Sequence, residues 1–230
     1  MAGPVAAPPA QAAPERTIRS KGAKLSVMVS STVYEIRPLL KQAFAMLAGY
    51  GYDVMMSDRL TVAVDPRGHN FDSCIRAVDI CDLFFGIITP SYGTGISKTE
   101  GRSITHMELM RSIELDKPRF MLCHQAVVSS RVLLNTLAFG DQPLKGAAGR
   151  AGLKLVSKSV LRDLRTIDML EAALREDIDN VDDRTNHWVA EYESEEDVKN
   201  YIATNFDPEG RNRVFLEDMI RTKSGKRGTA

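Results

Sequence analysis

The sequence predicts an α/β fold in which helices cover both faces of a doubly wound parallel sheet. Short apolar runs alternate along the chain with segments whose apolar residues recur at helical spacing, and this alternation is typical of such sheets. The runs are apolar at nearly every position, as expected for strands that are buried on both faces. The predicted strands are 25–29, 52–56, 83–89 and 120–124.

The segments between these runs predict the helices. Apolar residues recur at helical spacing from Ile36 to Leu47, and Pro38 fits that helix only in its first turn, where the missing N–H costs little. Further helices are predicted over 71–82 and 105–115. The chain therefore opens with a β-α-β unit, and such a crossover is almost always right-handed.

The pattern changes after the fourth strand. We predict a helix over 127–137, one long amphipathic helix over 153–178, an edge strand over 188–192 and a capped helix over 194–206. The apolar stripe of the long helix must be covered. We therefore expect it to pack on the core or on a second copy of the chain, which favours a homo-oligomer or a partner protein.

These patterns divide the chain into four regions. Residues 1–24 are rich in alanine and proline, which predicts a disordered tail. Residues 25–137 form the α/β domain, and residues 138–210 form a helical C-terminal extension packed on the core. Residues 211–230 are predicted to be a basic and mostly disordered tail with one short helical stretch.

Composition excludes several classes of function. The 230 residues include 30 Lys and Arg and 30 Asp and Glu, so the formal net charge is zero and no overall field favours nucleic acid or an anionic membrane. No apolar stretch reaches the ~20 residues of a membrane span. The absence of a signal-peptide pattern favours the cytoplasm. The cysteines lack metal-ligand spacing, so we expect free thiols, no metal site and no cofactor.

The best candidate site lies between the predicted third strand and the following helix. A loop with three glycines, Gly93, Gly95 and Gly101, connects them, and open α/β sheets place their ligands at such loops. Glu108 lies one turn into the helix and is the candidate reactive group. The alternative is a capping box, in which Thr105 caps the helix and the Glu108 carboxylate returns to the cap N–H.

Other residues near the same edge are candidates for binding a ligand. Ser30, Ser31 and Thr32 end the first strand and either bind phosphate or ribose hydroxyls or cap the next helix. Tyr92 either stacks on a base or forms a turn with Gly93. The remaining candidates for substrate binding are Asp82, Ser103 and Thr105; the alternative for Asp82, which we favour, is that it caps a helix end.

Three groups of residues together resemble a known family. They are Val27 to Thr32, Cys81-Asp82, and Ser91-Tyr92-Gly93 followed by Ser103 to Glu108 and Lys117-Pro118. This order resembles bacterial TIR-like domains that open on VFVSST and carry YG, then SxTxxE, then KP. The resemblance covers about residues 24–137 and implies a flavodoxin-like fold related to TIR domains and to nucleoside deoxyribosyltransferases.

The resemblance also implies a reaction. Catalytic TIR domains cleave the nicotinamide–ribose bond of NAD with a glutamate, and deoxyribosyltransferases use a glutamate as nucleophile; the matching position is Glu108. The expected function is an NAD-cleaving effector, as in bacterial defence or stress signalling, with NAD as substrate. The alternatives are a non-catalytic module that binds a nucleotide signal or assembles with partners, and a deoxyribosyltransferase-like enzyme.

Overall fold

The computed structural model describes residues 24–93, 95–156 and 160–227, so the predicted disordered tail lies outside it except for Lys24. Within these ranges, five strands form the central sheet in the order β2-β1-β3-β4-β7, and every neighbouring pair is parallel. The strands are β1 (Ser26–Ser31), β2 (Asp53–Met55), β3 (Leu83–Ile88), β4 (Arg119–His124) and β7 (Val189–Tyr192). The four strands predicted from the sequence are confirmed.

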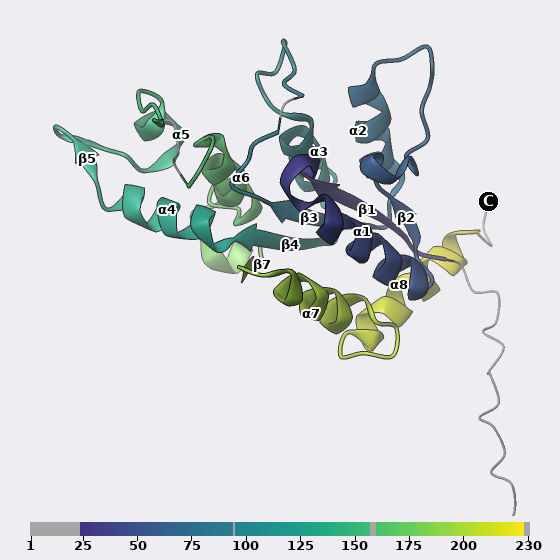
Figure 1. The fold of residues 1–230 in the computed structure, drawn as a ribbon. Coiled ribbons are helices and arrows are strands. Elements are labelled where there is room, and N and C mark those ends of the chain that lie inside the picture. Colours follow the sequence, from purple (N-terminus) through teal and green to yellow (C-terminus); the bar gives the residue numbers. More distant parts are fainter. Residues whose placement is uncertain (1–23, 94, 157–159, 228–230) are drawn as a thin grey trace, which may run out of the picture.

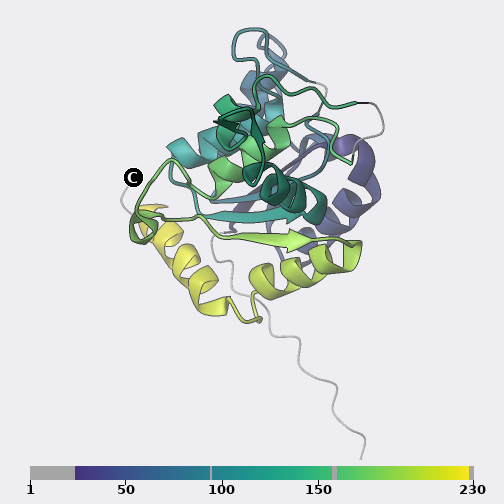
Figure 2. The same cartoon turned by 90° about the vertical axis from the view of Figure 1, so that its left-hand side faces the viewer.

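Helices cover both faces of this sheet, as predicted (Figures 1 and 2). One face packs on α1 (Val33–Gly49), α7 (Glu195–Phe206) and α8 (Arg213–Arg227). The other face packs on α2 (Asn70–Ile80), α3 (Ile104–Glu114) and α6 (Arg165–Ala173). Successive residues of a strand point to opposite faces, so Phe85 and Ile87 join the first core whereas Phe84 and Ile88 join the second.

The helix α1 shows how the chain accommodates Pro38. Its backbone is non-helical at Ile36, where φ is −119° and ψ is 22°, so the regular helix begins after a kink and Pro38 lies in its first turn. A proline in that position removes no intrahelical hydrogen bond. The prediction for Pro38 is therefore confirmed. The kink at Ile36 separates the residues that directly follow β1 from the regular helix.

The predicted long helix over 153–178 is wrong. Within the described residues of this range, 153–156 and 160–178, the one α-helix is the short α6, which begins at Arg165. The Asp163 carboxylate accepts from the Arg165 N–H at 2.9 Å and so favours a helix start there. The Arg162 N–H donates to the carbonyl of Pro90 at 3.1 Å, which ties the preceding segment to the loop after β3. Leu161 is nevertheless buried. The apolar spacing therefore indicated correctly that this residue is buried, although the segment is not one continuous helix.

The residues beyond 137 complete the same fold. The predicted edge strand is β7, which pairs with β4 and closes that side of the sheet. Composition predicted a mostly disordered tail over 211–230, but residues 213–227 form α8, whose Phe215, Leu216 and Met219 pack on the sheet. Residues 228–230 lie outside the described residues. Lys223 of α8 lies 2.6 Å from the carboxylate of Asp82 and fixes the far end of the helix.

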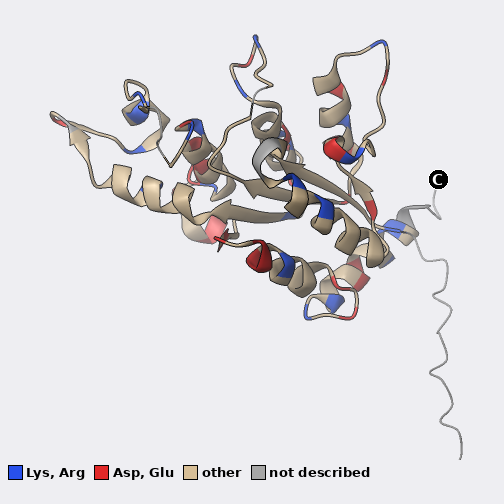
Figure 3. Cartoon of the chain, viewed as in Figure 1, with Lys and Arg blue, Asp and Glu red and all other residues tan. Residues whose placement is uncertain are grey.

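Three smaller elements follow β4. They are α4 (Gln125–Asn135), a two-stranded hairpin of β5 (Ala138–Phe139) and β6 (Gln142–Pro143), and α5 (Gly146–Arg150). Short 3-10 turns occur at η1 (Ser57–Arg59) and η2 (Val181–Asp183). The part of α4 farthest from the sheet and the hairpin extend away from the body of the molecule (Figure 1). Charged residues of both signs are interspersed along the helices and loops (Figure 3).

Candidate functional site

The candidate site lies where the chain turns to opposite faces of the sheet. β1 leads into α1 on one face, and the neighbouring β3 leads toward α3 on the other. In open α/β sheets, the carboxyl ends of two such strands form the crevice in which ligands bind. The side chains of Ser30 and Glu108 meet at this point, although they are 78 residues apart in the sequence.

Glu108 is a buried carboxyl group with two hydrogen-bond partners. Its side chain is 4% exposed, and the Ser30 hydroxyl donates to its Oε2 at 2.5 Å. The Cys74 thiol, on the adjacent helix α2, is the second partner. Glu108 is therefore held in one orientation by groups from a strand and from a neighbouring helix.

Burial governs the protonation of this group. Removal from water raises the pKa of Glu108 from 4.5 to about 7, against the hydrogen bonds from Ser30 and Cys74, which lower it. Burial, followed by the charge of Glu108, raises the pKa of the Cys74 thiol to about 12. The thiol therefore stays protonated near neutral pH, while the carboxyl group is divided between its two forms.

The predicted capping box between Thr105 and Glu108 is wrong. The cap of α3 is Ser103, whose hydroxyl accepts from the His106 N–H at 3.3 Å. Ser103 is held extended by a bridge to Ile96, so the helix begins at Ile104 and Thr105 already lies inside it. Since the Glu108 carboxyl binds Ser30 instead of the helix start, capping does not account for its position.

A pocket of about 100 Å³ opens beside Glu108. Its lining includes the predicted residues Ser31, Thr32, Gly93, Ser103 and Thr105 as well as Glu108. Gly93 has φ +95°, a conformation that residues with a side chain rarely adopt, so glycine is required there. The structure thus brings together most of the residues that the sequence analysis selected.

The Ser31 and Thr32 hydroxyls already have backbone partners. Ser31 donates to the carbonyl of Ile87 at 3.0 Å, and Thr32 donates to the carbonyl of Ser91 at 2.9 Å. Neither side chain caps α1. Their oxygens can still accept hydrogen bonds, which suits ribose hydroxyls better than phosphate oxygens.

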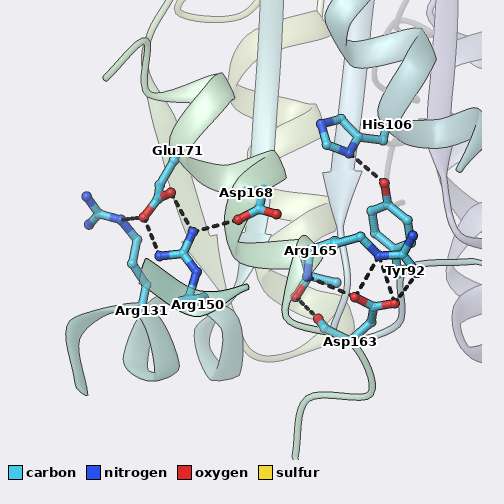
Figure 4. Close-up of polar contacts among 9 residues, drawn as sticks. Tyr92, His106, Arg131, Arg150, Asp163, Arg165, Asp168 and Glu171 are labelled. Carbon is cyan, nitrogen blue, oxygen red and sulfur yellow. Dashed lines mark hydrogen bonds and ion pairs between the residues drawn. The ribbon is translucent and has the colours of Figure 1, made fainter. Parts of the chain in front are cut away.

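Tyr92 is not the stacking platform that the sequence suggested. It is 2% exposed, and its hydroxyl lies 2.7 Å from the Nδ1 atom of His106. The Arg165 guanidinium covers the ring at 4.2 Å from its centre (Figure 4). Burial, with help from the charges of Arg102 and Arg165, lowers the pKa of His106 to about 4. Tyr92 and neutral His106 therefore support the loop that carries Gly93.

Asp82 lies away from the pocket, at the amino ends of the strands. It precedes β3 and accepts from the backbone N–H of Ser26 at 2.7 Å and from the Ser26 hydroxyl at 2.8 Å. Because Ser26 begins β1, both residues mark the amino ends of their strands. Asp82 neither binds a ligand beside Glu108 nor caps a helix; it ties β1, β3 and α8 together.

The sequence analysis missed two contributors to this site. Cys74 lies in the predicted helix over 71–82, and only the packing of α2 against α3 places its thiol beside Glu108. Arg165 lies far along the chain from Tyr92, and no local pattern connects the two. All three cysteines are free, as predicted, and no cluster of metal-ligating side chains occurs within the described ranges.

No helix within residues 24–93, 95–156 and 160–227 is long and apolar enough to cross a membrane. Residues 26–206 match the family described as a domain of unknown function (DUF4062). The chain belongs to this family. The matched region extends from β1 to the end of α7 and so includes β7 and α6 as well as the elements before residue 137.

Comparisons with curated proteins and with solved structures give no match for this chain.

Proposed function

We propose that this protein cleaves the N-glycosidic bond of a nicotinamide nucleotide, with NAD as the candidate substrate and Glu108 as the catalytic residue. The observation that carries the proposal is a single buried carboxyl group, oriented by Ser30, beside a pocket at the switch point of the sheet. Cleavage of this bond passes through a state with positive charge on the ribose. An ionised carboxylate next to that centre stabilises the charge.

One carboxylate is sufficient for this reaction. Nicotinamide carries a positive charge in NAD, so the electrons of the breaking C–N bond neutralise its ring nitrogen and no proton is needed for departure. Water then adds to the anomeric carbon and releases one proton. The products are nicotinamide and ADP-ribose. Ordinary glycosidases need a second carboxyl group because their leaving group must be protonated.

The size of the pocket limits what can enter it. Ligand sites commonly enclose about 300–1,000 Å³, whereas this pocket holds about 100 Å³. A whole dinucleotide exceeds this volume, so most of it must lie across the surface or displace the loop that carries Gly93. The same observation favours the second candidate, a non-catalytic module that binds part of a nucleotide.

The deciding experiment follows nicotinamide release from NAD by the wild-type protein and by Glu108→Gln. Glutamine keeps the shape of the side chain and its hydrogen bond from Ser30 but lacks the negative charge. We expect a loss of about 10²–10³-fold in kcat, the usual effect of removing one charge-stabilising group. Glu114→Gln is the matched control, because Glu114 lies exposed on the same helix and pairs with Arg111.

The two candidates give different results. If the wild type releases no nicotinamide but binds NAD in calorimetry, the non-catalytic module is correct. If Glu108→Gln cleaves NAD at the wild-type rate, Glu108 has no part in the mechanism. A wild type that transfers the ribosyl group to an added base instead of water would identify a transferase related to the deoxyribosyltransferases.

Ser30 provides an independent test because it acts through Glu108. The hydrogen bond from Ser30 lowers the pKa of Glu108, which burial raises to about 7. Activity requires the ionised form, so the wild-type rate should rise with pH through about 7 and then level off. In Ser30→Ala the pKa of Glu108 increases further, and the midpoint of the profile should move to higher pH. An unchanged midpoint would remove Ser30 from this role.

A further inference from the structure

A second and larger cavity lies at the amino edge of the sheet, away from Glu108. Its volume is about 830 Å³, within the range of about 300–1,000 Å³ that is usual for small-molecule sites. It is bordered by the amino ends of β4 and β7 together with α7 and α8, which Figure 2 shows on the same side of the molecule. The side chains that matter here are Arg119, Phe120, Arg184, Trp188, Tyr201 and Phe215. We call this cavity the amino-edge groove.

Arg119 is a buried cation without a carboxylate partner. Arg119 is 6% exposed. The guanidinium donates to four backbone carbonyls, those of Ser112 at 3.0 Å, Asn186 at 3.2 Å, and Lys117 and Thr185 at 3.4 Å each, while its Nε atom has no hydrogen-bond partner among the described residues. Within the same ranges no acidic side chain lies within ion-pair distance of it.

The surrounding charges do not neutralise Arg119. Burial, with the nearby charge of Arg175, lowers its pKa to about 10, and Asp116 opposes this effect. The Asp116 carboxylate is itself bound by the Asn186 side chain at 2.9 Å. At neutral pH the guanidinium therefore remains charged while largely buried, and the carbonyls that accept its hydrogen bonds carry no net charge to balance it.

Another buried arginine, Arg150, has carboxylate partners. Arg150 is 3% exposed, and its guanidinium lies 2.6 Å from the carboxylates of both Asp168 and Glu171 (Figure 4). Although burial acts against its charge, these two partners raise the pKa of Arg150 overall. The protein thus supplies two carboxylates to one buried arginine and none to the other. Arg119 is the arginine that borders a cavity large enough for a ligand to supply the anion.

The rest of the groove indicates what kind of anion fits. Its lining includes Arg184 as a second guanidinium, and no aspartate or glutamate is among the described residues that line it. Arginine pairs favour phosphate because the planar fork matches two phosphate oxygens. Trp188 is 76% exposed at the rim, and Phe120, Tyr201 and Phe215 provide further aromatic surface. Exposed tryptophan beside a cationic pocket suits a planar ring attached to phosphate.

We propose that the amino-edge groove binds a nucleoside phosphate, with the phosphates at Arg119 and Arg184 and the base against the aromatic side chains. This site is separate from the Glu108 pocket. The two lie at opposite ends of the strands, because Arg119 begins β4 whereas Ser30 lies near the carboxyl end of β1. Binding here therefore does not depend on whether Glu108 cleaves NAD.

Trp188 allows a direct test because it is the only tryptophan in the sequence. Titration of the full-length protein with ADP should change its fluorescence saturably, and calorimetry should give the same Kd. Adenosine and inorganic phosphate, which carry only one half of the proposed ligand, should each bind at least about tenfold more weakly than ADP. Glu108→Gln should bind ADP as the wild type does.

The arginine variants decide the proposal. Arg184→Gln should weaken ADP binding by about tenfold or more, since a charge-assisted hydrogen bond is lost. Arg213→Gln, at an exposed α8 arginine paired with Glu217, is the matched control and should bind normally. Arg119→Met should abolish binding while circular dichroism shows a folded protein; if it does not fold, Arg184→Gln decides. The proposal is overturned if ADP causes no saturable change at millimolar concentration, or if Arg184→Gln and adenosine both bind as tightly as the wild type binds ADP.

Discussion

The Glu108 pocket and the amino-edge groove each contain a buried ionisable group, at opposite ends of the strands of the same sheet. The two groups differ in whether they can lose their charge at neutral pH. Glu108 has two hydrogen-bond partners and can become neutral by taking up a proton, since its pKa is about 7. Arg119 keeps its proton at neutral pH because its pKa, although lowered, is about 10. The acid beside the pocket of about 100 Å³ can therefore lose its charge, whereas the buried guanidinium keeps its charge and has no acidic partner among the described residues to balance it.

The sharpest way to test the burial of Glu108 is the pH dependence of stability. The pKa of Glu108 rises from 4.5 to about 7 on folding. The protonated form is favoured in the folded state, so its contribution is complete below pH 4.5 and is lost as the pH rises through about 7. A shift of this size corresponds to about 3 kcal/mol.

Glu108→Gln removes this titration. The difference in free energy of unfolding, variant minus wild type, should therefore increase by about 3 kcal/mol from pH 4 to pH 8. Urea unfolding of both proteins at each pH measures the difference, and effects of other titrating groups cancel. Glu114→Gln, at an exposed position of the same helix, should show no such trend. A difference between Glu108→Gln and wild type that is independent of pH would contradict the burial of the carboxyl group.

The groove can be tested by the stability that a ligand adds. A ligand at a hundred times its Kd stabilises the folded state by about 2.7 kcal/mol. If the groove binds ADP, thermal unfolding of the wild type should shift upward at that concentration, and the shift should be absent in Arg119→Met. Equal shifts in both proteins would mean that ADP binds elsewhere.

The start of α3 offers a test of the corrected cap. Ser103→Ala should lower the free energy of unfolding by about 1 kcal/mol, the usual effect of losing a helix cap. Thr105→Val, which removes the hydroxyl but keeps the branched side chain, should change it by less than Ser103→Ala does, because Thr105 lies inside the helix. Urea unfolding distinguishes the two. A larger effect at Thr105 than at Ser103 would restore Thr105 as the cap.

The smallest expected effect concerns the attachment of α8. Lys223 lies 2.6 Å from the Asp82 carboxylate, and both side chains are partly exposed, so Lys223→Met should lower the free energy of unfolding by less than about 1 kcal/mol. Asp82→Asn should have a larger effect because the Asp82 carboxylate also accepts from the backbone N–H and hydroxyl of Ser26. Equal effects would mean that the bonds to Ser26 add nothing.

Local periodicity explains which parts of the fold could be predicted. The four central strands are apolar on consecutive residues, and the first three helices repeat with helical spacing, so neighbouring residues alone indicate both. The same reasoning failed over 153–178, where buried residues such as Leu161 and Ile167 follow a helical spacing although α6 begins only at Arg165. It also failed over 211–230, where packing of Phe215 and Leu216 on the sheet stabilises a helix that composition disfavours.

The candidate site was predictable to the extent that strand ends are. Ser30, Ser31, Thr32 and the loop with Gly93 end adjacent parallel strands, so the sequence by itself determined that they meet at one edge. Which polar group binds which depended on tertiary packing. Ser30 binds Glu108, which lies 78 residues away in the sequence. The Tyr92 hydroxyl contacts His106, and the Arg165 guanidinium covers the Tyr92 ring. Arg119 has no acidic partner among the described residues. These pairings arise from contacts between distant segments, and the loss of water on burial sets their energies.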